Sequence, residues 1–200
     1  MSEAREKIVE LIRTRGVVRP RDVEALGYHR KYLRSMVDDG ILERVGRGLY
    51  RLVDADPDER SSLAEVIARV PRAVLCLMTA LSWHGLTTQS PHEVWIAIPA
   101  NTWVPVDRGT QIRVIRMTEH WLAQGVETVD LDGITGHVTN PARTVVDCFW
   151  FRREVGLDVA IEALRDGLER SLFTPAQLHT LARDRRVLKT MRPYIEALVA

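Results

Sequence analysis

Cationic and hydroxyl side chains recur every three or four residues near the N-terminus. If 29–39 forms a helix, as its apolar residues indicate, Lys31, Arg34, Ser35 and Asp38 share one face of it. Arginine and lysine donate hydrogen bonds to phosphate oxygens, and the arginine fork also matches the two acceptors of guanine. Arg34 is therefore a better candidate than Lys31 for contact with a base. Asp38 would repel phosphate, so we expect it outside the contact.

Further candidate DNA contacts surround this helix. They lie at the start of a predicted helix or in a predicted hairpin, and they are Arg19, Arg21, Tyr28, His29, Arg30, Arg44, Arg47 and Arg51. Those at helix starts are candidates for phosphate contact. Arg47 occupies the hairpin tip and is best placed to reach the DNA backbone or minor groove. Arg44 and Arg51 fit equally well as solvated strand residues, and His29 as an ordinary exposed histidine.

Three short helices and a hairpin must position these side chains. Apolar spacing predicts helices over 2–15, from Pro20 for about two turns, and over 29–39, and a glycine follows each of them. Short alternating runs at 41–45 and 49–53 predict two strands joined by a Gly-Arg-Gly turn. Three helices followed directly by a hairpin are typical of a winged helix-turn-helix domain.

The rest of the chain predicts a second, mixed domain. An acidic, proline-containing stretch at 54–60 is the expected linker between a winged helix at 1–53 and a mixed α/β domain at 61–200. Helices are predicted over 61–69, 72–84, 141–153, 157–170, 175–183 and 187–199, and strands over 93–98, 112–116 and, as a hairpin turning near Gly133, 127–139. The expected fold class is therefore α+β, with a small sheet and a helical C-terminal end.

Charge is distributed unevenly along a chain whose formal net charge is only +1. Residues 1–52 contain 12 Lys/Arg against 8 Asp/Glu, whereas the remainder contains 16 against 19. A basic N-terminal part joined to a mildly acidic remainder is typical of a small nucleic-acid-binding domain attached to another domain. A chance distribution of a few charges is the alternative.

The composition, 46% hydrophobic and 28% charged over 200 residues, is that of a folded globular protein. No apolar run approaches the roughly 20 residues that span a bilayer, and the charged residues 1–10 do not resemble a signal peptide. Two cysteines, Cys76 and Cys148, are too few for a disulfide framework or a cysteine zinc knuckle. We therefore expect a cytoplasmic protein without membrane attachment.

Enzyme motifs are weak or missing in the predicted C-terminal domain. Lys189 is its only lysine, which nearly excludes a metal-dependent nuclease that needs a lysine on a strand. Asp130 and Asp132 have the spacing of a metal-binding pair, but they abut a predicted turn and lack the glycine–serine helix start that holds a triphosphate. No P-loop, dinucleotide-binding motif, nucleophile elbow or metal-ligand histidine spacing occurs. We expect no enzyme, no cofactor and no metal.

Segments spread along the chain resemble one protein family. The predicted wing GILERVGRGLY at 40–50, ALSWHGL at 80–86 with VWIAIP at 94–99, and NPARTVVD at 140–147 are similar to AbiEi antitoxins. These are transcriptional regulators of bacterial abortive-infection (type IV) toxin–antitoxin operons. The resemblance implies a winged helix that binds inverted repeats of double-stranded DNA in its own promoter. It also implies a C-terminal domain that counteracts a nucleotidyltransferase-type toxin, and no chemistry of its own.

Alternatives remain open at this point. The chain could be a stand-alone winged-helix regulator or a protein-interaction adaptor without a toxin partner, or the C-terminal domain could be a cryptic enzyme. Arg143 is expected to bind an acidic partner or, preferably, to pair with Asp147 four residues along its helix. His84 is expected to be a capping or core histidine. All five tryptophans lie beyond residue 53. We expect most of them to pack in the core and some to anchor a protein contact.

Overall fold

The computed structural model describes residues 2–46, 48–54, 59–104, 110–131 and 133–199. The chain divides into two compact units. The first contains Met1–Arg72, Trp103–Thr110 and Asp130–Gly136, and the second contains Ala73–Thr102, Gln111–Val129 and His137–Ala200. The expected domain boundaries at residues 53 and 61 stay a prediction.

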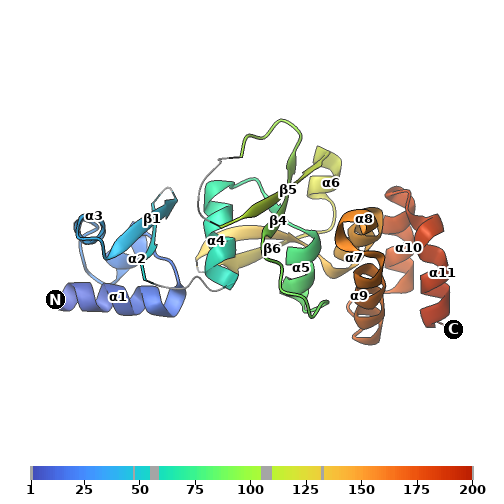
Figure 1. Ribbon diagram of the computed structural model, residues 1–200, viewed down its shortest axis with the longest axis horizontal. Helices are drawn as coiled ribbons and strands as arrows, with labels where there is room; N and C mark the ends of the chain where they lie inside the picture. The colour runs from blue at the N-terminus through green and yellow to red at the C-terminus, as the bar shows by residue number, and fades with distance from the viewer. Residues whose placement is uncertain (1, 47, 55–58, 105–109, 132, 200) are drawn as a thin grey trace. The chain divides into compact units, whose positions relative to one another are not determined.

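Three helices and a two-stranded sheet begin the first unit (Figure 1). They are α1 (Glu3–Arg15), α2 (Pro20–Ala25), α3 (Lys31–Asp38), β1 (Leu42–Gly46) and β2 (Leu49–Leu52). The strands pair antiparallel, and a bridge between Val18 and Tyr50 adds the segment before α2 to their edge. α4 (Glu59–Arg69) follows and contacts β1. The helices and the hairpin lie where the sequence predicts them.

One apolar cluster holds these elements together and fixes the orientation of α3. Ile8 and Ile12 of α1, Val23 of α2 and Leu33 and Met36 of α3 are at most 1% exposed. Full burial of each such side chain contributes roughly 1.5–3 kcal/mol. α3 therefore has a fixed inner face, and the opposite face must point outward.

A five-stranded mixed sheet forms the second architecture of the chain, with strand order β5-β4-β3-β7-β6. Its strands are β3 (Val74–Leu75), β4 (Val94–Pro99), β5 (Ile112–Met117), β6 (Val126–Leu131) and β7 (Ile134–Thr139). β3 runs antiparallel to β4 and parallel to β7, and β4 runs parallel to β5. All six residues of β4 are buried, as expected for a strand with neighbours on both sides.

Helices complete the second unit. They are α5 (Leu77–His84), α6 (Glu119–Ala123), α7 (Pro141–Trp150), α8 (Arg152–Val155), α9 (Leu157–Glu169), α10 (Pro175–Asp184) and α11 (Leu188–Val199). α7 packs against α5, α9 and α10, and α11 packs against α9 and α10 (Figure 1). The predicted α+β class, with a small sheet and helices gathered at the C-terminal end, is confirmed.

The structure corrects two predicted helices. The single helix expected over 72–84 is the strand β3 followed by α5, because a short apolar run fits a buried central strand as well as a buried helix. Leu77 begins α5 with φ of 48°, a left-handed value that separates the two elements. The helix expected over 141–153 ends at Trp150, and α8 begins beyond Phe151. α6 lies in a stretch with no prediction.

Both cysteines are predicted to be chemically silent in the folded protein. Cys76 and Cys148 are fully buried, and burial raises the pKa of each thiol well above its ordinary value. Neither thiol should react with an aromatic disulfide reagent at pH 7.5 in native buffer. After denaturant is added, both thiols should react. Rapid reaction of either thiol in native buffer would show that the core around α5 and α7 opens readily.

Candidate nucleic-acid interface

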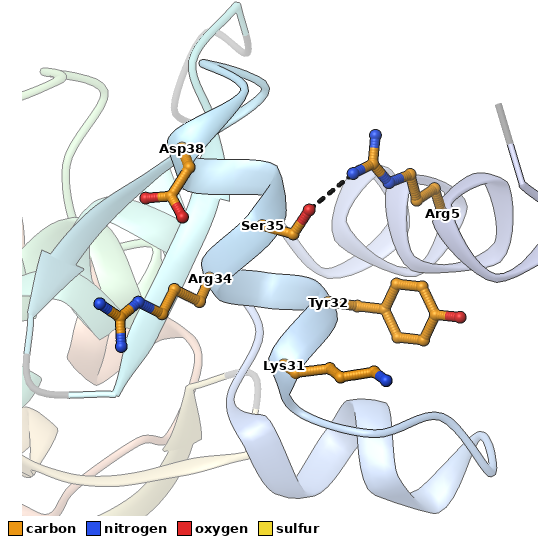
Figure 2. A pocket seen from close by; sticks show the side chains of 6 residues that line it. All are labelled: Arg5, Lys31, Tyr32, Arg34, Ser35 and Asp38. Carbon is orange, nitrogen blue, oxygen red and sulfur yellow. Dashed lines mark hydrogen bonds between the residues drawn. The ribbon is translucent and has the colours of Figure 1, made fainter.

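The outward face of α3 carries the charged side chains of the candidate interface (Figure 2). Lys31, Arg34 and Asp38 are exposed, whereas Leu33 and Met36 of the same helix are buried. The arrangement predicted from the helical spacing is therefore present. The cations project from a helix whose other side is fixed by packing.

Three cations at the start of α3 have no partner within the part of the chain that the structure describes. The side chains of Arg30, Lys31 and Arg34 make no hydrogen bond or ion pair there, and all three residues are exposed. Each can bind a phosphate without first breaking an internal ion pair. Release of condensed counterions from the nucleic acid then favours binding.

The residues just before α3 organise the start of the helix. The backbone N–H of Lys31 donates to Nδ1 of His29 at 3.1 Å, which satisfies one of the free donors in the first turn. Tyr28 is half-buried against the apolar cluster, and its ring meets that of Tyr32 edge to face with the centroids 6.2 Å apart. His29 stays exposed beside the cations, whereas the Tyr28 ring is held by packing.

Arg5 joins the candidate interface from α1, and sequence reasoning missed it. Its Nη2 donates to Oγ of Ser35 at 2.7 Å, the bond drawn in Figure 2, and to Oδ2 of Asp39 at 2.6 Å. Ser35 was expected to face DNA, and it is half-buried beside this guanidinium. Arg5 and Ser35 are separated by 30 positions in the chain, so no local spacing relates them.

A shallow hollow of about 400 Å³ lies over this face of α3. Its lining residues are Arg5, Lys31, Tyr32, Arg34, Ser35 and Asp38. In Figure 2, Arg34 and Asp38 project to one side of the helix, and Lys31 and Tyr32 project to the other, towards α1. Three cations against one carboxylate make the hollow net positive.

The hairpin contributes fewer free cations than the sequence suggests. Arg44 is exposed and donates from Nε to the carbonyl of Gly46 at 3.0 Å. Arg51 lies between two carboxylates, with Nε 2.6 Å from Glu43 and Nη1 3.3 Å from Glu65, and its side chain is only 19% exposed. These ion pairs join β2 to β1 and α4. Arg47, the predicted tip contact, lies outside the described residues.

The arginines at the start of α2 are also partly engaged. Nη2 of Arg21 donates to the carbonyl of Gly133 at 2.5 Å, and Nη1 of Arg19 approaches the same oxygen at 3.4 Å. The backbone N–H of Arg19 donates to the Asp22 carboxylate at 2.7 Å, which caps the helix. Desolvation and the neighbouring Arg21 lower the pKa of Arg19. Arg21 remains exposed; Arg19 is half-buried.

Arg143 forms part of a buried ion cluster in the second unit. Its Nε donates to Oδ2 of Asp147 at 2.7 Å, and its Nη1 donates to the carbonyls of Trp121 and Gln124 at 2.7 and 2.6 Å. Nε of Arg185 lies 3.1 Å from the other oxygen of Asp147. The Arg143 side chain is 1% exposed, so the preferred expectation of an internal pair with Asp147 is confirmed.

The histidine motif is likewise structural. Nε2 of His84 lies 2.7 Å from the carbonyl oxygen of Thr139, which links the end of α5 to the end of β7. Gly85 then ends the helix in the left-handed region. His84 is half-buried and contacts the carbonyl at the end of β7, so it neither lies in the core nor caps its own helix.

No cluster of three or more His, Cys, Asp or Glu placed to hold a metal ion occurs among the residues that the structure describes. No helix within these residues is long and apolar enough to cross a membrane.

Three helices and a hairpin, with cations on the outward face of the third helix, form an arrangement found in DNA-binding regulators. The chain carries a sequence match to one such group: residues 6–53 match the model of the AbiEi_4 family, described as "Transcriptional regulator, AbiEi antitoxin". The family resemblance is therefore confirmed over this part of the chain. The similarities at 80–86, 94–99 and 140–147 lie outside the match. No curated protein matches the chain.

Proposed function

We propose that this protein is a transcriptional autorepressor that binds double-stranded DNA with α3 in the major groove. The observation that carries the proposal is the trio Arg30, Lys31 and Arg34 at the start of α3 and just before it, exposed and, among the described residues, unpaired. The match of residues 6–53 to the AbiEi regulators supports it. On this proposal the protein acts in the cytoplasm as a regulator and not as an enzyme.

The cations divide between bases and phosphates by their chemistry. Arg34 lies one turn into α3, and its planar fork matches the N7 and O6 acceptors of guanine. Arg30 and Lys31, at the first turn, neutralise phosphates and set the position of the helix on the duplex. Arg44, exposed on the hairpin, and Arg47 are proposed to contact the adjacent backbone. Arg51, engaged by two carboxylates, instead stabilises the hairpin.

Selection from a random duplex library tests this function. The full chain should enrich one sequence, and its affinity should fall linearly on a log–log plot as salt rises, by about one unit of slope per phosphate contact. Autorepression further requires a related sequence upstream of the gene, with inverted repeats if the protein binds as a dimer. Failure to enrich any sequence, with binding independent of salt, would overturn the proposal.

Asp38 should weaken DNA binding, because its carboxylate lies on the same face as the cations. Replacement by Asn removes the repulsion of nearby phosphates, worth about 1 kcal/mol for unit charges 4 Å apart in water. The Asp38→Asn variant should therefore bind random duplex DNA several-fold more tightly in a fluorescence titration at 100 mM salt. The gain in affinity of the variant over the wild type should also become smaller as the salt concentration rises. Weaker binding to the selected duplex would show instead that Asp38 accepts a hydrogen bond from a base.

We also propose that the second unit counteracts a nucleotidyltransferase-type toxin, either by direct contact or by opposing the effect of the toxin in the cell. The support is the sequence similarity at 80–86 and 140–147 together with Trp150, whose side chain is 44% exposed on α7 and suits a protein contact. A variant with Arg30, Lys31 and Arg34 replaced by Ala should no longer repress a reporter gene under the promoter. It should still rescue cells that express the toxin from a separate promoter. Loss of rescue in the folded variant would contradict a division of labour. If no toxin gene lies next to the gene of this protein, a stand-alone regulator or a protein-interaction adaptor is the favoured alternative.

A further inference from the structure

We infer that Arg5 acts as a positioning residue that biases the Ser35 hydroxyl towards donating its hydrogen bond to DNA. The inference rests on the proposed function of α3 and names what one position of that helix recognises. A hydrogen-bond acceptor, either on a base edge in the major groove or on a phosphate, is the group it would bind.

The direction of the hydrogen bond follows from the donor inventory. A guanidinium has only N–H donors, so the 2.7 Å contact between Arg5 Nη2 and Ser35 Oγ uses a lone pair of the serine oxygen. A serine in a helix often directs its own hydrogen to the carbonyl four residues earlier, as Thr14 and Thr180 do here. Ser35 makes no such bond within the described residues. Its O–H is therefore free to point away from Arg5.

Asp39 holds Arg5 in this position. The second hydrogen bond of the same Nη2 atom, 2.6 Å to Asp39 Oδ2, crosses from α1 to the residue after α3. It compensates the charge of Arg5 and restricts the arginine side chain, which is only 26% exposed. Lys31 and Arg34 line the same hollow as Ser35, so an acceptor there would also lie close to two cations.

Arg5 occupies one of the two lone pairs of the serine oxygen, so donation by the hydroxyl becomes the favoured mode of contact with a base. A free serine hydroxyl rotates and can pair with either an acceptor or an amino group on a base edge. A hydroxyl held by Arg5 favours N7, the O6 of guanine or the O4 of thymine, and disfavours the amino groups of adenine and cytosine. Arg5 should thus sharpen base preference at one position without touching that base.

The test measures affinities of full-chain variants for the selected duplex and for each of its single-base substitutions. Ser35→Ala should lower affinity for the selected duplex by about 2- to 10-fold, the net effect of one hydrogen bond. Arg5→Gln, whose amide can accept as well as donate, should relax preference at the same position. Arg5→Lys, which can only donate, should restore it. The double variant Arg5→Gln/Ser35→Ala should behave like Ser35→Ala alone.

Two further sets of measurements complete the test. One distinguishes a phosphate acceptor from a base acceptor, and the other excludes unfolding as the cause of lost binding. Methylphosphonate substitution at single phosphates, or 7-deazapurine at single bases, should abolish the effect of Ser35→Ala at one site and so identify phosphate or base. Arg13→Gln, an exposed change on α1, is the matched control, and thermal melts check folding.

Unchanged affinity and base preference in folded Ser35→Ala, or additive effects of Arg5 and Ser35 at different positions, would overturn the inference. If the α3 triple variant binds DNA as the wild type does, the proposed function itself fails. If that triple variant loses binding while the Arg5 and Ser35 variants keep wild-type preferences, only the inference fails.

Discussion

Replacement of Arg30, Lys31 and Arg34 by Ala should reduce affinity for the selected duplex by at least about 3 kcal/mol, more than 100-fold. The three side chains are exposed and unpaired within the described residues, so their loss removes DNA contacts without breaking internal bonds. The salt dependence should also fall, by about two units of slope if Arg30 and Lys31 each neutralise one phosphate. Residual binding should resemble binding to random DNA, because Arg34 is the proposed base contact.

A charge-matched control separates this effect from the loss of net positive charge. Arg13, Arg153 and Arg165 are exposed arginines on three other helices, α1, α8 and α9. Their replacement by Ala removes the same charge and should change affinity only slightly. Equal losses in the two triple variants would show that DNA responds to overall charge and not to the surface of α3.

Replacement of Asp147 by Ala should cause the largest loss of stability, about 3–5 kcal/mol. The Asp147 side chain is 0% exposed and lies between the guanidinium groups of Arg143 and Arg185, whose side chains are 1% and 9% exposed. Burial raises the pKa of this carboxyl, and the two arginines oppose that rise. Without the carboxylate, two buried cations repel each other with no counter-charge. Urea unfolding followed by circular dichroism measures the loss.

The control is Asp184→Ala, because Asp184 is an exposed carboxylate that pairs with Arg183 at 3.6 Å. An exposed ion pair of this kind contributes about 0–1 kcal/mol, so the midpoint should barely move. If Asp147→Ala were as stable as Asp184→Ala, the cluster would not be a determinant of the fold. Replacement of Arg143 by Met alone should be milder, since Asp147 keeps Arg185.

The sequence predicted the first three helices well because their apolar residues follow helical spacing and a glycine lies shortly after each helix. The inward position of Leu33 and Met36 required only a helical wheel. In contrast, the strand at Val74 and Leu75 depends on long-range pairing with β4 and β7. An apolar run of that length does not distinguish a central strand from a buried helix.

The candidate interface was predictable where it is local and unpredictable where it depends on tertiary contacts. Arg34 and Lys31 follow from the spacing on α3. The approach of Arg5 from α1 and the pairing of Arg51 with Glu65 on α4 join segments distant in the chain. Arginines of the same type thus divide into free and engaged groups, and only the fold tells them apart.

Affinity cleavage tests the placement of α3 on DNA most directly. Because Cys76 and Cys148 are buried, an Asp38→Cys variant can be labelled selectively with an iron–EDTA reagent at an exposed position of α3. With the selected duplex, the labelled protein should cut both strands around the bases fixed by selection, whereas a label at Arg165→Cys on α9 should not. Strand cuts centred on those bases from position 38 are the predicted result. Two results would contradict the placement of α3 on the bases: a bound duplex that the label at position 38 does not cut, or a cutting pattern identical for labels at positions 38 and 165.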